Sequence, residues 1–204
     1  MAGVQQVTGR AVALDRRDVD TDQIIPASWL KRVERTGFEA GLFGAWRDDP
    51  DFVLNQPGAA EAKILVAGTN FGCGSSREHA VWALQNFGFQ AVVSPRFADI
   101  FRGNCISSGL VPVETSETAV AALFAALAED PAAEVTVDVA ARTVSIPSAG
   151  LSEPFTIADF AQWRLLEGLD DVALTLRHED AISAYEAGRL PWLPASPVIE
   201  RAGA

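Results

Sequence analysis

Cysteine and histidine are scarce in this sequence, with two of each among 204 residues. Cys73 and Cys105 form no C-x-x-C pair. Two thiols are too few for a disulfide framework, and too few for a zinc or iron–sulfur site, which takes about four protein ligands. We therefore expect no metal bound by this chain alone, and a reducing compartment.

Long hydrophobic runs are also missing. The N-terminal residues, Met1 to Gln6, have neither a basic stretch nor an apolar core, so they do not resemble a secretory signal. No stretch approaches the ~18 uninterrupted apolar residues that a membrane-spanning helix needs. We expect a cytoplasmic protein without a membrane partner.

Positive charge is the third shortage. The chain has 16 Lys and Arg against 27 Asp and Glu, a formal net charge of −11. An acidic protein repels the phosphate backbone, so the composition disfavours a nucleic-acid binder. Residues 1–110 carry 11 basic and 12 acidic side chains, whereas residues 111–204 carry 5 and 15. The concentration of basic residues in the first half favours an anion bound there, although chance variation on a solvated surface gives the same counts.

The chain does have enough apolar residues, 49%, for a sizeable core, which excludes a disordered protein. Apolar runs predict strands at 7–14, 63–68, 91–93 and 110–113, and a hairpin over 135–146. Helical patterns predict one helix that ends at Phe87 and four others at 97–107, 116–129, 158–166 and 180–187. Residues 28–47 are expected to form short helix and loop.

The order of these elements predicts an α/β protein. Strands that alternate with helices from 63 to 113 indicate a parallel βαβ layer, and the hairpin with the first strand indicates a second, antiparallel layer. We expect a single domain over 1–193. Prolines recur at intervals of three near the C-terminus, so 194–204 is expected to be a disordered proline-containing tail or an extended segment that lies on a partner.

One segment is rich in residues suited to chemistry. Residues 64–79 predict a buried strand, a glycine-rich turn and a helix start. Ser75 lies three residues before Glu78, which is the spacing of a capping box. A helix N-terminus attracts anions, and the Arg77 guanidinium fits a carboxylate. The segment therefore predicts a pocket for a carboxylate or phosphate.

Each residue of this segment also has a plain structural explanation. Ser75 is then a helix cap, Arg77 pairs with a surface carboxylate, His79 is a lone polar side chain and Cys73 is a small hydrophobe. Other loop motifs do not fit. The dinucleotide fingerprint needs Gly or Ala where Arg77 stands, and the phosphate-binding loop and the nucleophile elbow lack their required residues.

Several motifs together resemble the swivelling domain of the aconitase superfamily. The most specific is the Gly-Ser-Ser-Arg-Glu-His run within 71–80, followed by the acidic motif at 20–26. Shorter matches at 36–38, 51–55, 97–101 and 168–176 narrow the resemblance to the small subunits of bacterial 3-isopropylmalate dehydratases. The resemblance extends from about residue 4 to about residue 193. For the fold, the resemblance implies a three-layer β/β/α swivelling domain.

The resemblance also implies a reaction. Enzymes of this family isomerise 2-isopropylmalate to 3-isopropylmalate in leucine biosynthesis, by removing water and adding it back the other way round. A 4Fe–4S cluster acts there as a Lewis acid, and its cysteines lie in the large subunit. The implied partner is that large subunit, in a heterodimer, and the implied substrate is a small dicarboxylate.

Family roles carry over to the residues that match the motifs. Ser75 matches the base that takes the carbon-bound proton, and its alkoxide needs stabilisation by helix N–H groups and by Arg77. Ser76 and Arg77 match residues that hold a substrate carboxylate. Asp22 matches an aspartate that orients a histidine supplied by another domain.

A second carboxylate is bound in the family by an arginine on the loop after the acidic motif. Spacing and local similarity disagree about its counterpart, which is Lys31, Arg32 or Arg35, with Arg35 favoured. The apolar neighbours Leu30 and Val33 are candidates to receive the isopropyl group.

Three other functions stay open at this point. The chain can be the small subunit of a related hydratase, of the homoaconitase or citraconate/methylmalate type. It can be a stand-alone hydrolase that uses Ser75 or Cys73 with His79. It can also be a non-catalytic module that keeps the fold.

Overall fold

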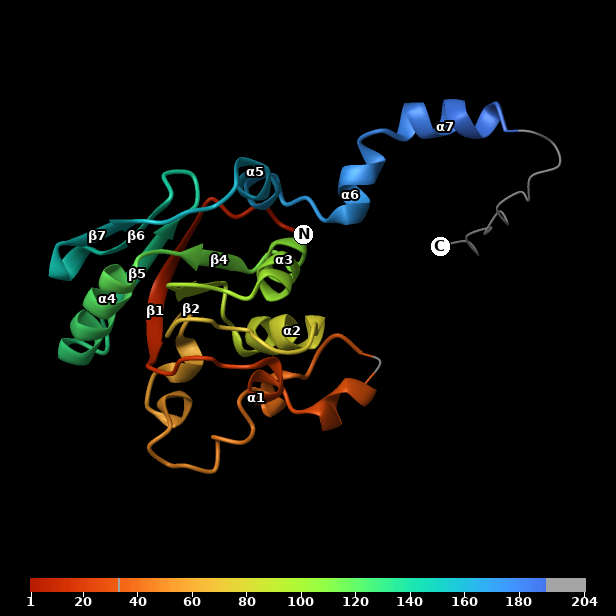
Figure 1. Cartoon of the computed structure of the whole chain (residues 1–204). Helices are drawn as coiled ribbons and strands as arrows, with labels where there is room; N and C mark the ends of the chain where they lie inside the picture. The colour runs from red at the N-terminus through yellow and green to blue at the C-terminus, as the bar shows by residue number, and fades with distance from the viewer. Residues whose placement is uncertain (33, 190–204) are drawn as a thin grey trace. The chain divides into compact units, whose positions relative to one another are not determined.

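The computed structural model describes residues 1–32 and 34–189, which divide into two compact units between Asp170 and Asp171 (Figure 1). The first unit contains the strands β1 (Gln6–Leu14), β2 (Ile64–Ala67), β3 (Ala91–Ser94), β4 (Val111–Glu114), β5 (Glu134–Asp138), β6 (Thr143–Ile146) and β7 (Leu151–Pro154). Its helices are α1 (Thr21–Ile24), α2 (Glu78–Phe87), α3 (Asp99–Ser108), α4 (Glu117–Glu129) and α5 (Asp159–Glu167).

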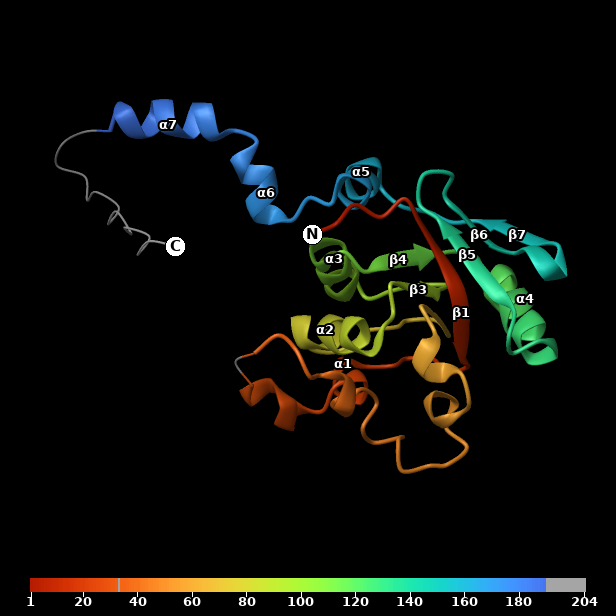
Figure 2. The ribbon, with the colours of Figure 1, turned by 180° about the vertical axis from the view of Figure 1, so that it is seen from behind.

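The strand β1 belongs to two parts of one sheet. Among the described residues, seven strands form a sheet in the order β4-β3-β2-β1-β5-β6-β7. The second half of β1, Ala11–Leu14, pairs in parallel with β2, whereas Gln6–Arg10 pairs in antiparallel register with β5 (Figure 2). The predicted parallel and antiparallel layers are both confirmed. They are two parts of one curled sheet that continues through β1, and their facing side chains share one apolar cluster.

The short parallel strands are buried on both faces. In β2, Ile64 and Val66 point into one apolar cluster, while Leu65 and Ala67 point into another. Because side chains alternate along a strand, a strand with no polar side must be covered on both faces. This explains why the sequence shows continuous apolar runs at β2 and β3 instead of an alternation.

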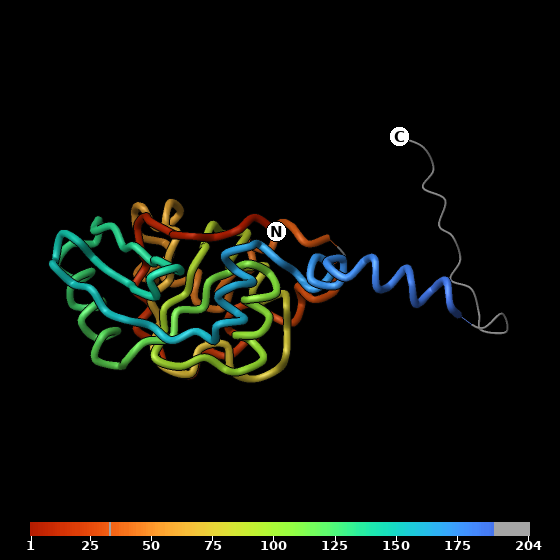
Figure 3. The backbone as a smooth tube through the Cα atoms, turned by 90° about the horizontal axis from the view of Figure 1, so that it is seen from above, coloured from red at the N-terminus to blue at the C-terminus, as the bar shows by residue number. Residues whose placement is uncertain are grey.

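Each face of the parallel strands has its own cover. The helices α2 and α3 and the loops of the first 60 residues pack on one face, and α4 and the antiparallel strands pack on the other. In Figures 1 and 3 the antiparallel strands and α4 gather at one end of this unit, and α2 and α3 at the other. The resulting arrangement is the predicted three-layer β/β/α fold.

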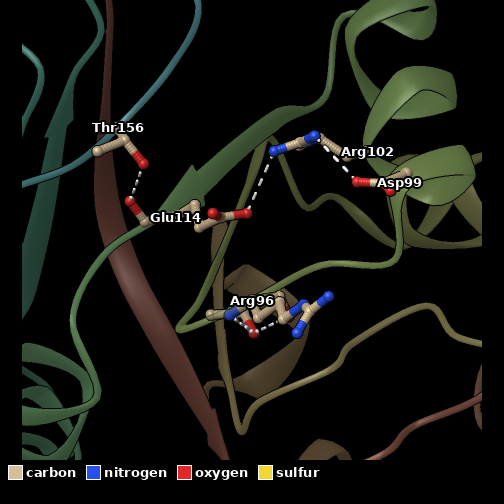
Figure 4. A network of polar contacts seen from close by, with 6 residues as sticks. Arg96, Asp99, Arg102, Glu114 and Thr156 are labelled. Atoms are coloured by element: carbon tan, nitrogen blue, oxygen red, sulfur yellow. Dashed lines mark hydrogen bonds and ion pairs between the residues drawn. The ribbon is translucent and has the colours of Figure 1, made fainter.

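A polar network fastens the carboxyl end of β4 to the elements beside it (Figure 4). The Arg102 guanidinium of α3 lies 3.4 Å from the Glu114 carboxylate and 3.0 Å from that of Asp99. The Thr156 N–H donates to the Glu114 carbonyl at 2.8 Å. The chain after β7 is thereby held beside β4.

The second unit begins at Asp171 and contains α6 (Asp171–Leu176) and α7 (Glu179–Ala187). Neither helix contains a buried residue. The sequence patterns predict α7 but not α6, and they also miss α1 and the edge strand β7. The predicted domain boundary at 193 and the tail at 194–204 lie outside the described residues.

We predict that the core between the two parts of the sheet contributes more stability than the polar network. Leu123 of α4 is fully buried there, so Leu123→Ala should lower the free energy of unfolding by about 2–5 kcal/mol. The Arg102 side chain is 44% exposed, so Arg102→Ala should cost less than about 1 kcal/mol. Urea titrations of both variants test this ranking, and equal losses would contradict it.

Candidate active site

The two motifs of the sequence meet at the carboxyl ends of neighbouring parallel strands. The acidic loop follows β1 and continues into α1, and the glycine-rich loop follows β2 and continues into α2. Figure 2 shows α1 beside α2. Loops that follow adjacent parallel strands emerge at the same edge of a sheet, where open α/β proteins usually bind ligands.

The backbones of these loops are hydrogen-bonded to each other. The Gly72 N–H donates to the Val19 carbonyl at 2.8 Å, and the Thr21 N–H donates to the Cys73 carbonyl at 2.9 Å. The Thr21 hydroxyl donates to the Ser75 carbonyl, also at 2.9 Å. Residues 73–75 are therefore held along the acidic loop, and Thr21 takes a positioning role that the sequence did not suggest.

The predicted capping box at Ser75 and Glu78 is wrong. Helix α2 begins at Glu78, and its N-cap is Arg77, which makes no side-chain capping bond. Ser75 lies two residues before this N-cap, and its carbonyl accepts a hydrogen bond from the Thr21 hydroxyl. The capping box lies instead at α1, where Asp20 accepts from the Gln23 N–H at 2.7 Å and the Gln23 side chain accepts from the Asp20 N–H.

The glycine-rich turn needs glycine for two reasons. Gly72 has a φ of +76°, in the left-handed region that favours glycine. A Cβ at this position would also lie 2.2 Å from the Phe101 ring of α3. The ring of Phe101 packs in turn against Phe71, so the turn is seated on an aromatic base.

Asp22 and Arg77 form an ion pair, although 55 residues separate them in the sequence. The Arg77 side chain is 17% exposed and that of Asp22 is 54% exposed. Ser75 and Ser76, which precede Arg77, are both exposed. The structure thus gathers four of the predicted site residues on an open surface.

The basic side chains of residues 31–35, after α1, are held in different ways. Arg32 donates to the Gly37 carbonyl at 2.9 Å, and its guanidinium lies over the Trp29 ring at 4.9 Å. Arg35 is exposed, and its guanidinium lies 5.0 Å from the centre of the Trp82 ring. Lys31 is exposed and Leu30 is half-buried. Val33, the other predicted neighbour of the isopropyl group, lies outside the described residues.

His79 takes part in an aromatic cluster and is not placed as a catalytic base. Its ring centre lies 4.7 Å from that of Trp82 and 5.5 Å from that of Phe38. In the part of the chain that the structure describes, no hydrogen bond joins His79 to Ser75. The hydrolase arrangement therefore lacks the contact between nucleophile and base that it needs.

The Cys73 thiol is not activated either. Partial burial raises its pKa, and the negative charges of Asp20 and Asp18 raise it further. Cys105 is fully buried, and that burial raises its thiol pKa well above the ordinary value. Both thiols are therefore protonated near neutral pH, which is the opposite of what a nucleophilic cysteine requires.

No group of three or more His, Cys, Asp or Glu residues is placed to hold a metal ion within residues 1–32 and 34–189. None of the helices in those ranges is long and apolar enough to cross a membrane.

Comparison with known proteins agrees with the motifs. The model of the aconitase C-terminal domain matches residues 1–118, and the model of the C-terminal domain of the 3-isopropylmalate dehydratase small subunit matches 171–196. The chain is 63% identical over 189 residues to the 3-isopropylmalate dehydratase small subunit of Frankia alni, and the match covers 93% of this chain and 96% of that protein. The chain belongs to the family of 3-isopropylmalate dehydratase small subunits.

Other members of this small-subunit family are nearly as similar. That of Thermobifida fusca is 59% identical over 93% of this chain and 96% of its own length. That of Rubrobacter xylanophilus is 55% identical over 95% of this chain and 98% of its own. The crystal structure of 3-isopropylmalate dehydratase from Methanocaldococcus jannaschii matches with a TM-score of 0.67 at 26% identity, covering 88% of this chain and 99% of that one. The family consists of subunits of a hydro-lyase.

We predict that Gly72→Ala disrupts the site by destabilising its turn. The new methyl group must displace the Phe101 ring, and the alanine backbone must keep a positive φ. The free energy of unfolding should therefore fall by about 2–4 kcal/mol. Gly103 is a matched control in α3, where a Cβ meets nothing within 4 Å. Gly103→Ala should stabilise the chain by about 0.4–1 kcal/mol. Thermal or urea unfolding tests both, and a neutral Gly72→Ala would contradict the prediction.

We also predict that Cys73 reacts slowly with iodoacetamide near neutral pH. The thiolate is the reactive form. Because the pKa of Cys73 is raised, the pH at which alkylation reaches half its maximal rate should be higher in the folded chain than in the urea-unfolded chain. Peptide mass spectrometry separates the labelling of Cys73 from that of the buried Cys105. A Cys73 midpoint below that of the unfolded chain would show an activated thiol and reopen the nucleophile hypothesis.

Proposed function

We propose that this chain is the small subunit of a hydro-lyase that isomerises 2-isopropylmalate to 3-isopropylmalate in leucine biosynthesis in the cytoplasm. One observation carries the proposal. The family's two motifs meet in the Asp22–Arg77 ion pair, directly beside the exposed Ser75 and Ser76. The active site is formed only when this surface is covered by a large iron–sulfur subunit.

The exposure of the serines supports a site shared between two chains. A serine hydroxyl in open water is far too weak an acid to act as a base through its alkoxide. A partner that excludes water strengthens the attraction between an alkoxide at Ser75 and the Arg77 guanidinium, because charges interact more strongly at low dielectric. In the assembled enzyme, Ser75 takes the carbon-bound proton of the substrate.

Arg77 and Ser76 hold one substrate carboxylate. A guanidinium has five N–H donors in a planar fork, so Arg77 can contact Asp22 and still bind a carboxylate. Asp22 keeps more than half of its side chain exposed, so it is within reach of a histidine from the large subunit. Asp22 thus fixes Arg77 from one side and a partner histidine from the other.

Arg35 binds the second carboxylate. Arg32 is the weaker candidate because its guanidinium is already committed to the Gly37 carbonyl and the Trp29 ring. Lys31 offers a single point charge rather than a planar fork. Leu30, half-buried on the same segment, faces the isopropyl group in this proposal.

The iron–sulfur cluster belongs to the large subunit. When bound, the cluster supplies a Lewis acid for the leaving hydroxyl. The described residues of this chain do not fit its ligation, since Cys105 is buried and neither thiol is inclined to ionise.

The test is reconstitution with an anaerobically prepared large subunit, following the unsaturated isopropylmaleate intermediate by ultraviolet absorbance. We predict that the wild-type chain restores turnover and that Ser75→Ala lowers kcat by about 10²–10⁴-fold, since it removes the base. Ser148→Ala is the matched control, because Ser148 is an exposed serine in a turn far along the chain. It should leave kcat unchanged.

Other outcomes would redirect the proposal. Full turnover with Ser75→Ala would favour the non-catalytic module. Turnover of another hydroxy acid in place of 2-isopropylmalate would favour a homoaconitase or a citraconate/methylmalate hydratase. Ester hydrolysis by the chain alone, lost in His79→Ala, would favour the hydrolase.

A further inference from the structure

Trp82 lies on the same helix that begins immediately after Arg77. It follows His79 by three residues, so the two side chains share one face of α2, and their ring centres are 4.7 Å apart. Phe38 packs against both rings, at 5.9 Å from Trp82 and 5.5 Å from His79. The Phe38 N–H also donates to the Asn86 side chain of α2 at 3.1 Å. The segment that carries Arg35 is therefore anchored to α2 close to Arg35.

Arg35 itself has one fixed contact. Its guanidinium carbon lies 5.0 Å from the centre of the Trp82 ring, within the range of a cation–π interaction. Within the described residues, Arg35 makes no ion pair and no hydrogen bond. Arg32, by contrast, is held by a carbonyl as well as by rings. The orientation of Arg35 thus depends on the indole of Trp82.

We propose that Trp82 is a positioning residue that holds the Arg35 guanidinium in place for the second carboxylate of the substrate. The inference rests on the proposed function, which supplies the substrate and the role of Arg35. Helix α2 then sets both cations, Arg77 at its N-cap and Arg35 through the Trp82 ring. The carbon chain of a dicarboxylate limits how far apart its two charges can lie, so two cations anchored to one rigid helix favour it over acids of other lengths.

The contact should affect substrate binding rather than the proton transfer. Without the indole ring, the long Arg35 side chain samples many rotamers and must be ordered when the substrate binds. Trp82 does not touch the reacting atoms in this proposal. Trp82→Leu should therefore raise KM about three- to tenfold and leave kcat within about twofold of the wild type.

The experiment is a double-mutant cycle in the complex reconstituted with the large subunit. Trp82→Leu and Arg35→Ala are measured singly and together with 2-isopropylmalate. If Trp82 acts through Arg35, Trp82→Leu should change KM by less than about twofold in the Arg35→Ala background. Trp82→Phe keeps a smaller ring under the guanidinium and should bring KM back toward the wild-type value.

Trp46 provides a matched control. It is half-buried against the same apolar cluster as Trp82, and its ring lies 4.2 Å from the Arg16 guanidinium and packs against Phe43 and Phe52, which are not predicted site residues. Trp46→Leu removes the same ring and should leave KM unchanged in the folded complex. Circular dichroism and thermal melts confirm that each variant is folded, and Trp82→Phe keeps the test valid if Trp82→Leu does not fold.

Two results would overturn the inference. One is an equal rise in KM for Trp82→Leu with and without Arg35, and the other is an equal rise for Trp46→Leu. Both presuppose a wild-type complex that turns over 2-isopropylmalate, so they leave the proposed function intact. A wild-type complex without that turnover would instead contradict the proposed function.

Discussion

The structure depends on the double pairing of β1. Residues Gln6–Arg10 form hydrogen bonds with the antiparallel strand β5, and Ala11–Leu14 form them with the parallel strand β2. Backbone groups of a buried strand must be paired, so the two parts of the sheet can enclose their shared core only if β1 continues from one to the other. The same strand then delivers the acidic loop to the carboxyl end of β2. Without this crossing, Asp22 would not reach Arg77.

The site follows from how the two loops pair with each other. Thr21 binds the backbone of Cys73 and Ser75, which keeps the glycine-rich loop along the acidic loop and delays the start of α2 until Glu78. The serines are therefore presented to solvent instead of being used as helix caps. Arg77, at the helix N-cap, is left to pair with Asp22. The outcome is an open surface with one ion pair and two exposed serines, which is the form that the proposed function expects of a chain whose partner completes the site.

The shortage of cysteine also fits a chain that does not hold a metal by itself. One thiol is fully buried and the other lies near two carboxylates, so neither is suited to a metal or to nucleophilic attack. The useful chemistry of the described surface is cationic and hydroxylic. In the proposed function, those groups bind and orient a carboxylate substrate, and the Lewis acid comes from the large subunit. Within the described residues, the acidic second half of the sequence forms β4, the antiparallel strands β5, β6 and β7, and the helices α4 to α7.

The sequence by itself determined the elements that depend on local patterns. Apolar runs predict β2, β3 and β4, and the Gly-Ser-Ser-Arg-Glu-His run identifies the family and most of the candidate site. Patterns are weak where elements are short or exposed: β7 is an edge strand that ends in Pro154, and α6 has six residues. The capping box at Ser75 has the correct local spacing and is still wrong.

Only the tertiary structure decided what depends on residues far apart in the chain. The partner of Arg77 lies 55 residues away, and the hydroxyl that holds Ser75 lies 54 residues away. The Arg35 guanidinium lies over the Trp82 ring, which belongs to another element. Local spacing cannot reveal such contacts, because hydrogen bonds and ring contacts between distant segments form only after β1 has joined the two parts of the sheet.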